Sequence, residues 1–260
     1  MISRTLVVVL CLCSSSLEQP MFFTNSFKGL EGLTVPRNQF SGDVPAVYYH
    51  DQTVAVVELG FDNELHNCDL VEIYEPREAV EVLRNLSVLG EPREISFQDM
   101  TTLMQQCDQV DVILQGTTPT LPTSTPSGEN QQGVNPLTLF SGILPGTKWC
   151  GSGDIATNYH DLGQEARIDR CCRTHDHCPA KVRAQRTRYD VTNYSLYTKS
   201  HCNCDEGLYQ CLKTANHPTA NVMGVIYFNI VRVPCLEDIP ESERAPRGPT
   251  KRFRPPKMRY

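Results

Sequence analysis

A histidine stands beside an aspartate in a cysteine-rich segment. Residues 171–178 read CCRTHDHC and place His175 and Asp176 between cysteines, and residues 202–205 read CNCD and end in Asp205. A carboxylate within hydrogen-bond reach of one imidazole nitrogen fixes the tautomer and leaves the other nitrogen free as a base. These residue types therefore predict a general base at His175, oriented by Asp205.

Upstream of the histidine, Gly151 and Gly153 alternate in the segment 149–153, which reads WCGSG. Glycines at alternate positions let a loop turn its carbonyl oxygens inward, and calcium accepts about six to eight such oxygens. Asp176, next to the histidine, could add a charged ligand. A Gly-x-Gly loop alone is a weak pattern, but beside the histidine motif it predicts a calcium site.

Two antiparallel helices would bring these side chains together. Cys171 and Cys178 are two helical turns apart, and Cys204 and Cys211 share that spacing. In a constant antiparallel register Cys171 meets Cys211 and Cys178 meets Cys204, with His175 between them and Asp205 within about one turn. The spacing favours this pairing without proving it, because eight cysteines allow on the order of a hundred connectivities.

Three motifs together carry a family resemblance. PGTxWCGxG at 145–153, CCRTHDxC at 171–178 and CxCD at 202–205 resemble the group III secreted phospholipase A2 family, typified by the bee venom enzyme. The similarity covers about residues 143–235. It implies a mainly α, disulfide-rich domain with two clamped antiparallel helices and a calcium loop, which hydrolyses the sn-2 ester of phospholipids to a lysophospholipid and a fatty acid.

The resemblance also implies residue roles. His175 would be the general base, Asp205 would orient it, and Tyr227 would hydrogen-bond the aspartate. The carbonyls of Trp149, Gly151 and Gly153 and the Asp176 carboxylate would bind calcium, and the Gly151 N–H would stabilise the oxyanion. The implied disulfides are Cys150–Cys172, Cys171–Cys211, Cys178–Cys204 and Cys202–Cys235.

The sequence also departs from the bee venom enzyme. His177 replaces a methionine and is expected on an exposed helix face. The histidines at 160, 201 and 217 are likewise expected at the surface. No cysteine follows Cys235, so one disulfide of that enzyme has no counterpart. An acidic front domain of this size has none either, and it could be a propeptide, an inhibitory cover or a binding module.

Composition divides the chain into five parts. Residues 1–16 resemble a signal peptide, 17–115 form an acidic N-terminal domain, and 116–142 are a Thr/Pro/Ser-rich linker. Residues 143–240 hold the motifs, and 241–260 are expected to be a basic disordered tail. Residues 17–142 carry 5 Lys+Arg against 18 Asp+Glu, whereas residues 143–260 carry 18 against 12. The two halves could therefore attract each other.

The acidic domain is expected to be a small α+β unit. Short strands are predicted at 46–49, 53–59 and 69–74, a helix at 76–85 and another after Ser96. Cys68 and Cys107 lie in this domain. Its acidic side chains, Glu72 among them, are expected to form a solvated face.

Twelve cysteines suit an oxidising compartment, and ten remain after removal of the signal segment. With no later apolar segment of membrane-spanning length, the protein is expected to be secreted and extracellular. Asn85 and Asn193 lie in glycosylation sequons. The expected partner is a phospholipid membrane or micelle surface, with no nucleic acid, and the expected state is a monomer.

Other interpretations remain. His175 could be a buried structural histidine, and the Cys/His cluster could bind zinc. A non-catalytic protein of the same fold, acting as a receptor or membrane ligand, is the main alternative function.

Overall fold

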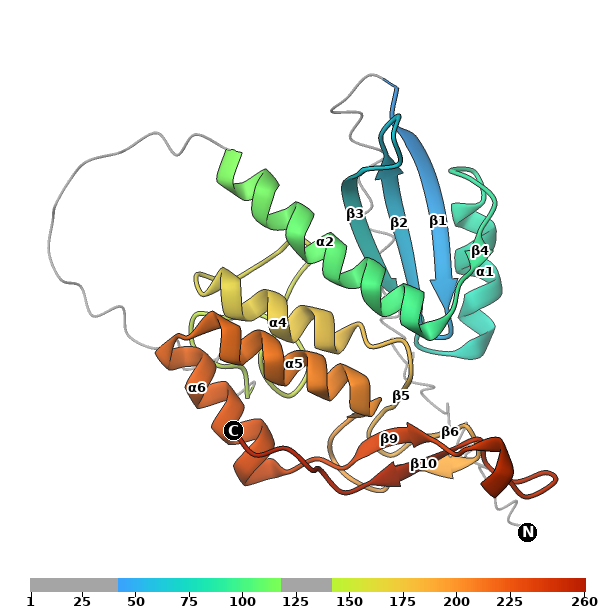
Figure 1. The fold of residues 1–260 in the computed structure, drawn as a ribbon, viewed down its shortest axis with the longest axis vertical. Coiled ribbons are helices and arrows are strands. Elements are labelled where there is room, and N and C mark those ends of the chain that lie inside the picture. The colour runs from blue at the N-terminus through green and yellow to red at the C-terminus, as the bar shows by residue number, and fades with distance from the viewer. Residues whose placement is uncertain (1–41, 118–141) are drawn as a thin grey trace, which may run out of the picture.

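The computed structural model describes residues 42–117 and 142–260, which form two parts side by side (Figure 1). The expected signal segment at 1–16 lies outside the described residues, as do the start of the acidic domain and nearly all of the expected linker. Within the described residues, no helix is both long and apolar enough to cross a bilayer.

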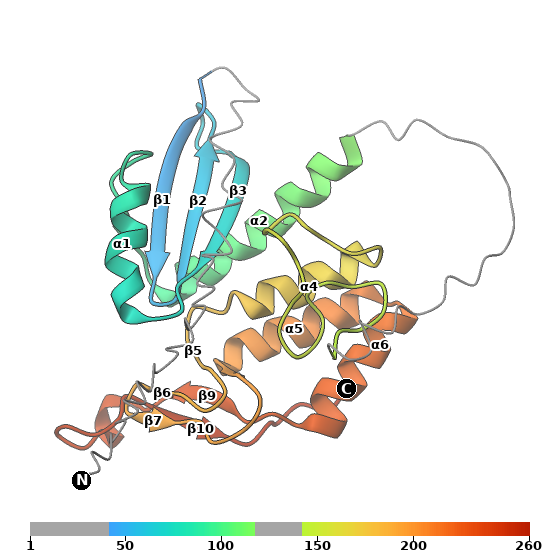
Figure 2. The ribbon, with the colours of Figure 1, turned by 180° about the vertical axis from the view of Figure 1, so that it is seen from behind.

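The N-terminal part is a four-stranded sheet between two helices. The strands are β1 (Val44–His50), β2 (Thr53–Leu59), β3 (Leu65–Glu72) and β4 (Arg93–Glu94), in the order β3-β2-β1-β4. The helices α1 (Pro76–Leu86) and α2 (Phe97–Thr117) cover opposite faces (Figures 1 and 2). The central strand β2 is buried on both faces, so it is an apolar run and not an alternating one.

Alternate residues of β2 supply the two cores. Val54 and Val56 pack with Val82 and Leu86 of α1, whereas Ala55 and Val57 pack with Met100 and Met104 of α2. The Cys68–Cys107 disulfide ties β3 to α2. Helix α2 lies between the sheet and the second part of the molecule (Figure 1).

The second part is built on two disulfide-linked helices, α4 (Ala166–Asp176) and α5 (Cys202–Ala215). Cys171–Cys211 and Cys178–Cys204 join them, with Cα–Cα distances of 5.7 and 5.9 Å. Cys150–Cys172 ties the preceding loop to α4, and Cys202–Cys235 ties α5 to a later strand. These are the four pairs that the family resemblance implies.

Short elements complete this part. The strands β5 (Lys181–Val182) and β8 (Lys199–Ser200) pair with each other, as do β6 (Thr187–Arg188) and β7 (Val191–Thr192). After α5, helix α6 (Pro218–Gly224) continues into the π-helix η1 (Val225–Val231), which carries Tyr227. Short π-helical segments are frequent at functional sites.

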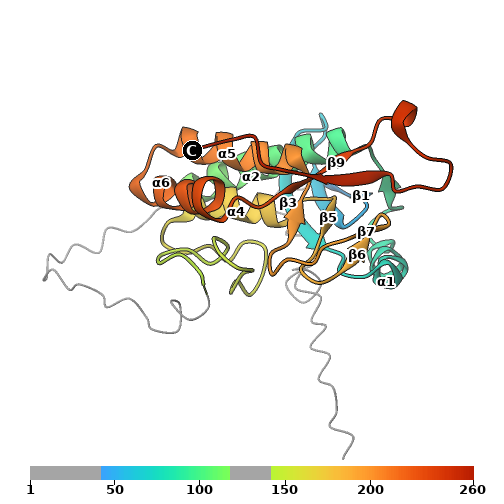
Figure 3. The same cartoon turned by 90° about the horizontal axis from the view of Figure 1, so that it is seen from below.

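The C-terminal residues are ordered, contrary to the predicted disordered tail. They contain the 3₁₀ turn η2 (Glu241–Glu243) and strand β10 (Lys251–Arg254), which pairs with β9 (Cys235–Asp238) along the lower edge of the molecule (Figures 1 and 3). The charges of Arg252 and Arg254 are balanced by Glu237 of β9. Tyr260 then stacks on Phe228 of η1. Strand pairing and acidic partners, rather than local sequence, stabilise this segment.

Candidate active site

The His175 imidazole lies on α4 between the two interhelical disulfides. Its Nε2 is 2.8 Å from the Asp205 Oδ1 on α5. The Tyr227 hydroxyl donates to the same carboxylate oxygen at 2.9 Å and lies 3.3 Å from His175 Nε2. Asp205 is only 3% exposed. Because the carboxylate accepts a hydrogen bond from Nε2–H, the tautomer leaves Nδ1 as the basic nitrogen.

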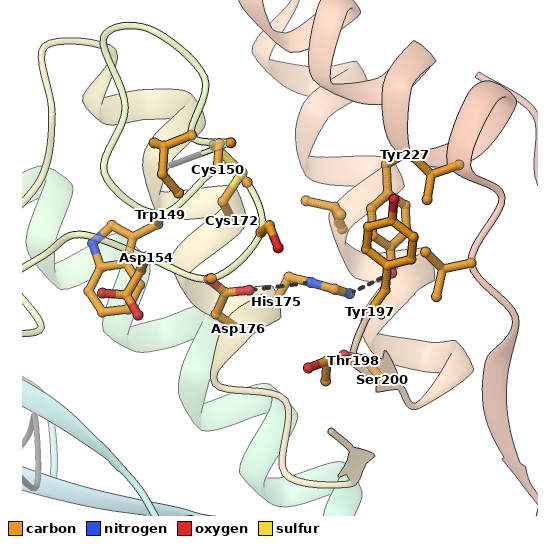
Figure 4. A pocket seen from close by; sticks show the side chains of 18 of the residues that line it. Trp149, Cys150, Asp154, Cys172, His175, Asp176, Tyr197, Thr198, Ser200 and Tyr227 are labelled. Atoms are coloured by element: carbon orange, nitrogen blue, oxygen red, sulfur yellow. Dashed lines mark hydrogen bonds and ion pairs between the residues drawn. A yellow bond between two sulfur atoms is a disulfide. The ribbon is translucent and has the colours of Figure 1, made fainter. Parts of the chain in front are cut away.

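Nδ1 of His175 points toward Asp176, whose Oδ1 is 3.9 Å away (Figure 4). Burial lowers the pKa of His175, but the carboxylates of Asp176 and Asp205 outweigh it and raise that pKa to about 9. Burial raises the pKa of Asp176 to about 6. Any positive charge placed beside Asp176 would favour its ionised form and oppose protonation of His175.

The glycine loop reaches the same site because Cys150 is bonded to Cys172 on α4. Gly151 is the required residue at its position, since an added Cβ would lie 2.3 Å from the Gly142 carbonyl oxygen. Gly153 has a φ of +87°, which glycine adopts readily and other residues avoid. The loop is thus held in one conformation by a disulfide and by its own backbone geometry.

A buried aspartate, which the sequence motifs did not indicate, organises the loop from below. Asp169 of α4 is fully buried, and its carboxylate accepts from the backbone N–H groups of Lys148, Trp149 and Gly163. The donor–acceptor distances run from 2.7 to 3.0 Å. No sequence signal pointed to it, because Asp169 lies outside the three motifs and its partners belong to a loop whose path only the folded domain shows.

The donor set suits calcium better than a transition metal. In the part of the chain that is described, no group of three or more His, Cys, Asp or Glu side chains could hold a metal. The Asp176 Oδ2 atom is nevertheless buried and has no hydrogen-bond partner. Asp176 lines one pocket together with Trp149, Gly151 and Gly153. One carboxylate with several backbone carbonyls is a donor set typical of a hard cation.

The pocket itself has a volume of about 750 Å³. His175 and Asp176 stand in its middle, with the loop on one side and Tyr227 and Tyr197 on the other (Figure 4). Apolar side chains line much of the remaining wall: Leu144, Leu208, Met223, Ile226, Val231 and Val233. The pocket can therefore hold a molecule with an apolar body next to the imidazole.

The N-terminal part of the chain contributes to this pocket as well. Glu72 of β3 and Tyr74 line it, near Lys181 and Arg183. The Glu72 carboxylate forms ion pairs with both cations. The sequence analysis placed Glu72 on a solvated face. That prediction is wrong, because the carboxylate is paired with two cations beside the pocket.

The position predicted for His177 is wrong. His177 is 5% exposed and packs against Trp149 and Tyr159, with Nδ1 2.8 Å from the Arg173 carbonyl. Burial lowers its pKa to about 4, so it is neutral at physiological pH. The helix-face argument failed because Trp149 and Tyr159, from the segment that precedes α4, cover the imidazole.

Two other histidines also have partners that the sequence did not reveal. His160 lies 2.8 Å from Asp69 and 3.1 Å from Asp111, and His201 is 6% exposed and lies 3.2 Å from Asp238. His217 is partly exposed, as expected, and its Nδ1 is 3.5 Å from Glu165.

The two sequons differ in accessibility. Asn85 is exposed on α1. Asn193 is fully buried, and its side-chain amide donates to the carbonyls of Val182 and Tyr197. A glycan would replace one of the two N–H donors and would need space that a fully buried side chain does not have, so the folded structure contradicts glycosylation at Asn193.

Comparisons with known proteins match the same region. Residues 143–239 fit a family model described as Phospholipase A2. The chain is 43% identical over 95 residues to phospholipase A2 isozymes of Heloderma suspectum, covering 36% of this chain and 66% of the relative. It is 37% identical over 96 residues to a phospholipase A2 of Apis cerana cerana, covering 36% of this chain and 72% of the relative.

A third relative is much longer than the matched region. The group 3 secretory phospholipase A2 of Bos taurus is 45% identical over 93 residues, which is 36% of this chain and 19% of the bovine protein. Residues 42–117 lie outside the segment that the family model matches.

Proposed function

Because the chain belongs to the group III secretory phospholipase A2 family, a family of enzymes, we propose that it is a calcium-dependent phospholipase A2. It hydrolyses the sn-2 ester of a glycerophospholipid to a lysophospholipid and a free fatty acid. The observation that carries this proposal is the His175–Asp205–Tyr227 arrangement next to Asp176 and the glycine loop. A buried, oriented base beside a cation-type donor set suits ester hydrolysis by water.

The chain's own residues have distinct roles in this mechanism. Nδ1 of His175 takes a proton from water, which then attacks the ester carbonyl, and Asp205 stabilises the imidazolium that forms. Tyr227 holds the Asp205 carboxylate in place by donating to it. The backbone N–H of Gly151 would donate to the developing oxyanion. The proton on Nδ1 later passes to the leaving alkoxide.

The cation would be held by the carbonyl oxygens of Trp149, Gly151 and Gly153 and by Asp176. When bound there, calcium polarises the ester carbonyl and neutralises charge on the oxyanion and the substrate phosphate. Asp176 has a buried carboxylate oxygen without a hydrogen-bond partner, and a bound cation would interact with that oxygen.

Exposed apolar side chains support a lipid interface as the place of action. Leu196, Tyr197 and Ile226 line the pocket, and the neighbouring residues of the same two segments are exposed as well. We call the whole set the apolar rim: Tyr194, Leu196, Tyr197, Val222, Val225, Ile226 and Ile230. A cluster of this kind around a pocket mouth marks a surface that contacts another apolar phase. The five disulfides suit an extracellular enzyme, and we propose that the protein is secreted.

A phospholipid with distinguishable sn-1 and sn-2 chains tests the proposal. The protein is added to vesicles of this lipid with calcium and again with a chelator, and the released fatty acids are identified. We expect release of the sn-2 chain with calcium and its loss with the chelator. Binding to the vesicles without release of any fatty acid would instead identify the non-catalytic binding protein.

A further inference from the structure

The two parts of the molecule contact each other with opposite charges. Every carboxylate in its ion pairs comes from residues 42–117, and every cation comes from residues 142–260. The pairs are Asp51–Arg188, Asp69–His160, Asp111–His160, Glu72–Lys181, Glu72–Arg183, Asp108–Arg173 and Asp111–Arg173. The acidic front half and the basic back half of the sequence thus meet at specific sites.

Arg173 is at the centre of this contact. Its side chain is fully buried, although it lies on α4 only two residues before His175. The guanidinium donates to Asp108 at 2.8 Å and lies 2.6 Å from Asp111, both on α2. A buried guanidinium without its carboxylates would be strongly unfavourable. Helix α4 therefore requires α2 beside it.

The dependence is mutual, because Tyr159 of the second part completes a core of the first. It packs with Ala55, Leu70, Met100 and Met104, and it is 4% exposed. The Arg173 guanidinium carbon also lies over this ring, 3.8 Å from the ring centroid. Without this ring, the face of the sheet that α2 covers would lose part of its apolar core.

The β1–β2 turn and the start of β2 form hydrogen bonds with the segment that follows the candidate active site. The Gln52 amide, 1% exposed, donates to the Lys181 carbonyl at 2.8 Å, and the Thr53 hydroxyl donates to the His177 carbonyl at 2.6 Å. Both acceptors lie within five residues of Asp176. Among the described residues, however, each disulfide lies within one part, so no covalent cross-link joins the two.

We propose that residues 42–117 are a permanently docked lobe of the enzyme and not a propeptide that leaves after cleavage. When the chain is cut between residues 118 and 141, the two pieces stay bound as a two-chain protein. The polar contacts above, all buried or half-buried, and the shared Tyr159 core hold them together. This property concerns folding and association alone, and it does not rest on hydrolysis.

A nicked full-length protein tests this proposal without any change at the interface. A recognition sequence for a site-specific protease is inserted within residues 118–141, and the purified protein is cut under non-reducing conditions. Size-exclusion chromatography then follows at about 0.15 M salt, where the Debye length is roughly 8 Å. We expect both fragments in one peak at the elution volume of the uncut protein. Separation into two peaks would overturn the proposal.

A matched pair of variants tests which contacts hold the lobe. In the nicked Asp108→Asn/Asp111→Asn protein, Arg173 keeps its charge but loses both carboxylates. We therefore expect the dissociation constant of the two fragments to rise by at least about a hundredfold. The control is Glu81→Gln, an exposed carboxylate on α1, the helix on the other face of the sheet. Equal affinity of the double variant and the control would overturn the ionic basis of docking.

The two proposals can fail separately. A nicked complex that stays together but releases no fatty acid would reject the proposed function and support the docked lobe. Fragments that separate while the C-terminal one still hydrolyses phospholipid would reject the docked lobe alone.

Discussion

At the scale of single residues, the sequence predicted the groups that could do chemistry but not the groups that hold them. Nothing in the motifs pointed to Asp169, yet its carboxylate joins three backbone N–H groups around the glycine loop. Asp205 and Tyr227 could be named because they occur in recognisable segments. Asp169 could not, because its partners lie in a loop whose path depends on the whole domain.

Asp169→Asn should weaken calcium binding. An amide retains one acceptor oxygen and turns an N–H₂ toward a backbone N–H, so about one charge-assisted hydrogen bond is lost, on the order of 1.5–3 kcal/mol. The calcium dissociation constant should rise by about ten- to a hundredfold. Trp149 is the only tryptophan and lies in the loop, so its fluorescence reports the titration directly.

Asp190→Asn is the matched control, because Asp190 is an exposed aspartate that belongs neither to the glycine loop nor to the residues that hold it. Its calcium titration should equal that of the unaltered protein. A folded Asp169→Asn protein with unchanged calcium affinity would show that the loop does not depend on this carboxylate.

At the scale of helices and strands, local spacing predicted the elements that local sequence determines. The shared two-turn cysteine spacing fits α4 and α5 because both helices carry their own cross-links. The tail was missed because β10 exists only by pairing with β9, and its arginines find acidic partners on β9 and η2 only in the folded chain. The burial of His177 was missed for the same reason, since another element covers its helix face.

The contact that His160, in the loop before α4, makes with β3 and α2 should also show a measurable pH dependence. Burial lowers the pKa of His160, but its hydrogen bonds with Asp111 and Asp69 outweigh burial and raise that pKa from 6.5 to about 9. Because the folded pKa is the higher one, the stabilisation is fully present below about pH 6.5 and is lost as pH rises through about 9. The loss is about 3 kcal/mol in unfolding free energy.

Chemical denaturation of the unaltered protein and of His160→Gln, at pH 6.5 and pH 9.5, measures this effect. The other charged groups around His160, which are Asp69, Asp111 and Arg173, are present in both proteins. The unaltered protein should lose more stability than the variant over this range. Equal losses would show that the imidazole is not charged in the folded protein.

At the scale of the whole molecule, the charge asymmetry predicted an attraction but could not identify the pairs. Partners such as Asp108 and Arg173 are 65 positions apart, and Asp51 and Arg188 are 137 apart. No local pattern connects residues at that distance. The same reasoning failed for Glu72, whose two cations lie more than a hundred residues downstream.

Glu72→Gln should change the preference for lipid surfaces. Burial raises the pKa of Glu72, but Lys181 and Arg183 outweigh it and lower the pKa, so the carboxylate is charged at neutral pH. Its removal adds one net positive charge beside the pocket, worth about 1 kcal/mol at an anionic surface. The ratio of hydrolysis rates on anionic and zwitterionic vesicles should rise about fivefold.

Glu81→Gln again serves as control, since this exposed carboxylate lies on α1, away from the pocket. Its rate ratio should stay that of the unaltered protein. An unchanged or smaller ratio in Glu72→Gln would mean that the Glu72 charge does not reach the bound lipid.

The central claim is that Nδ1 of His175, oriented through Nε2 by Asp205, is the base that activates water. Its most direct test is the calcium-dependent release of the sn-2 fatty acid by His175→Gln, with intact mass confirming that all five disulfides have formed. General-base catalysis contributes about a hundred- to ten-thousandfold, so turnover should fall by at least about a hundredfold. Hydrolysis at the rate of the unaltered protein would contradict the account.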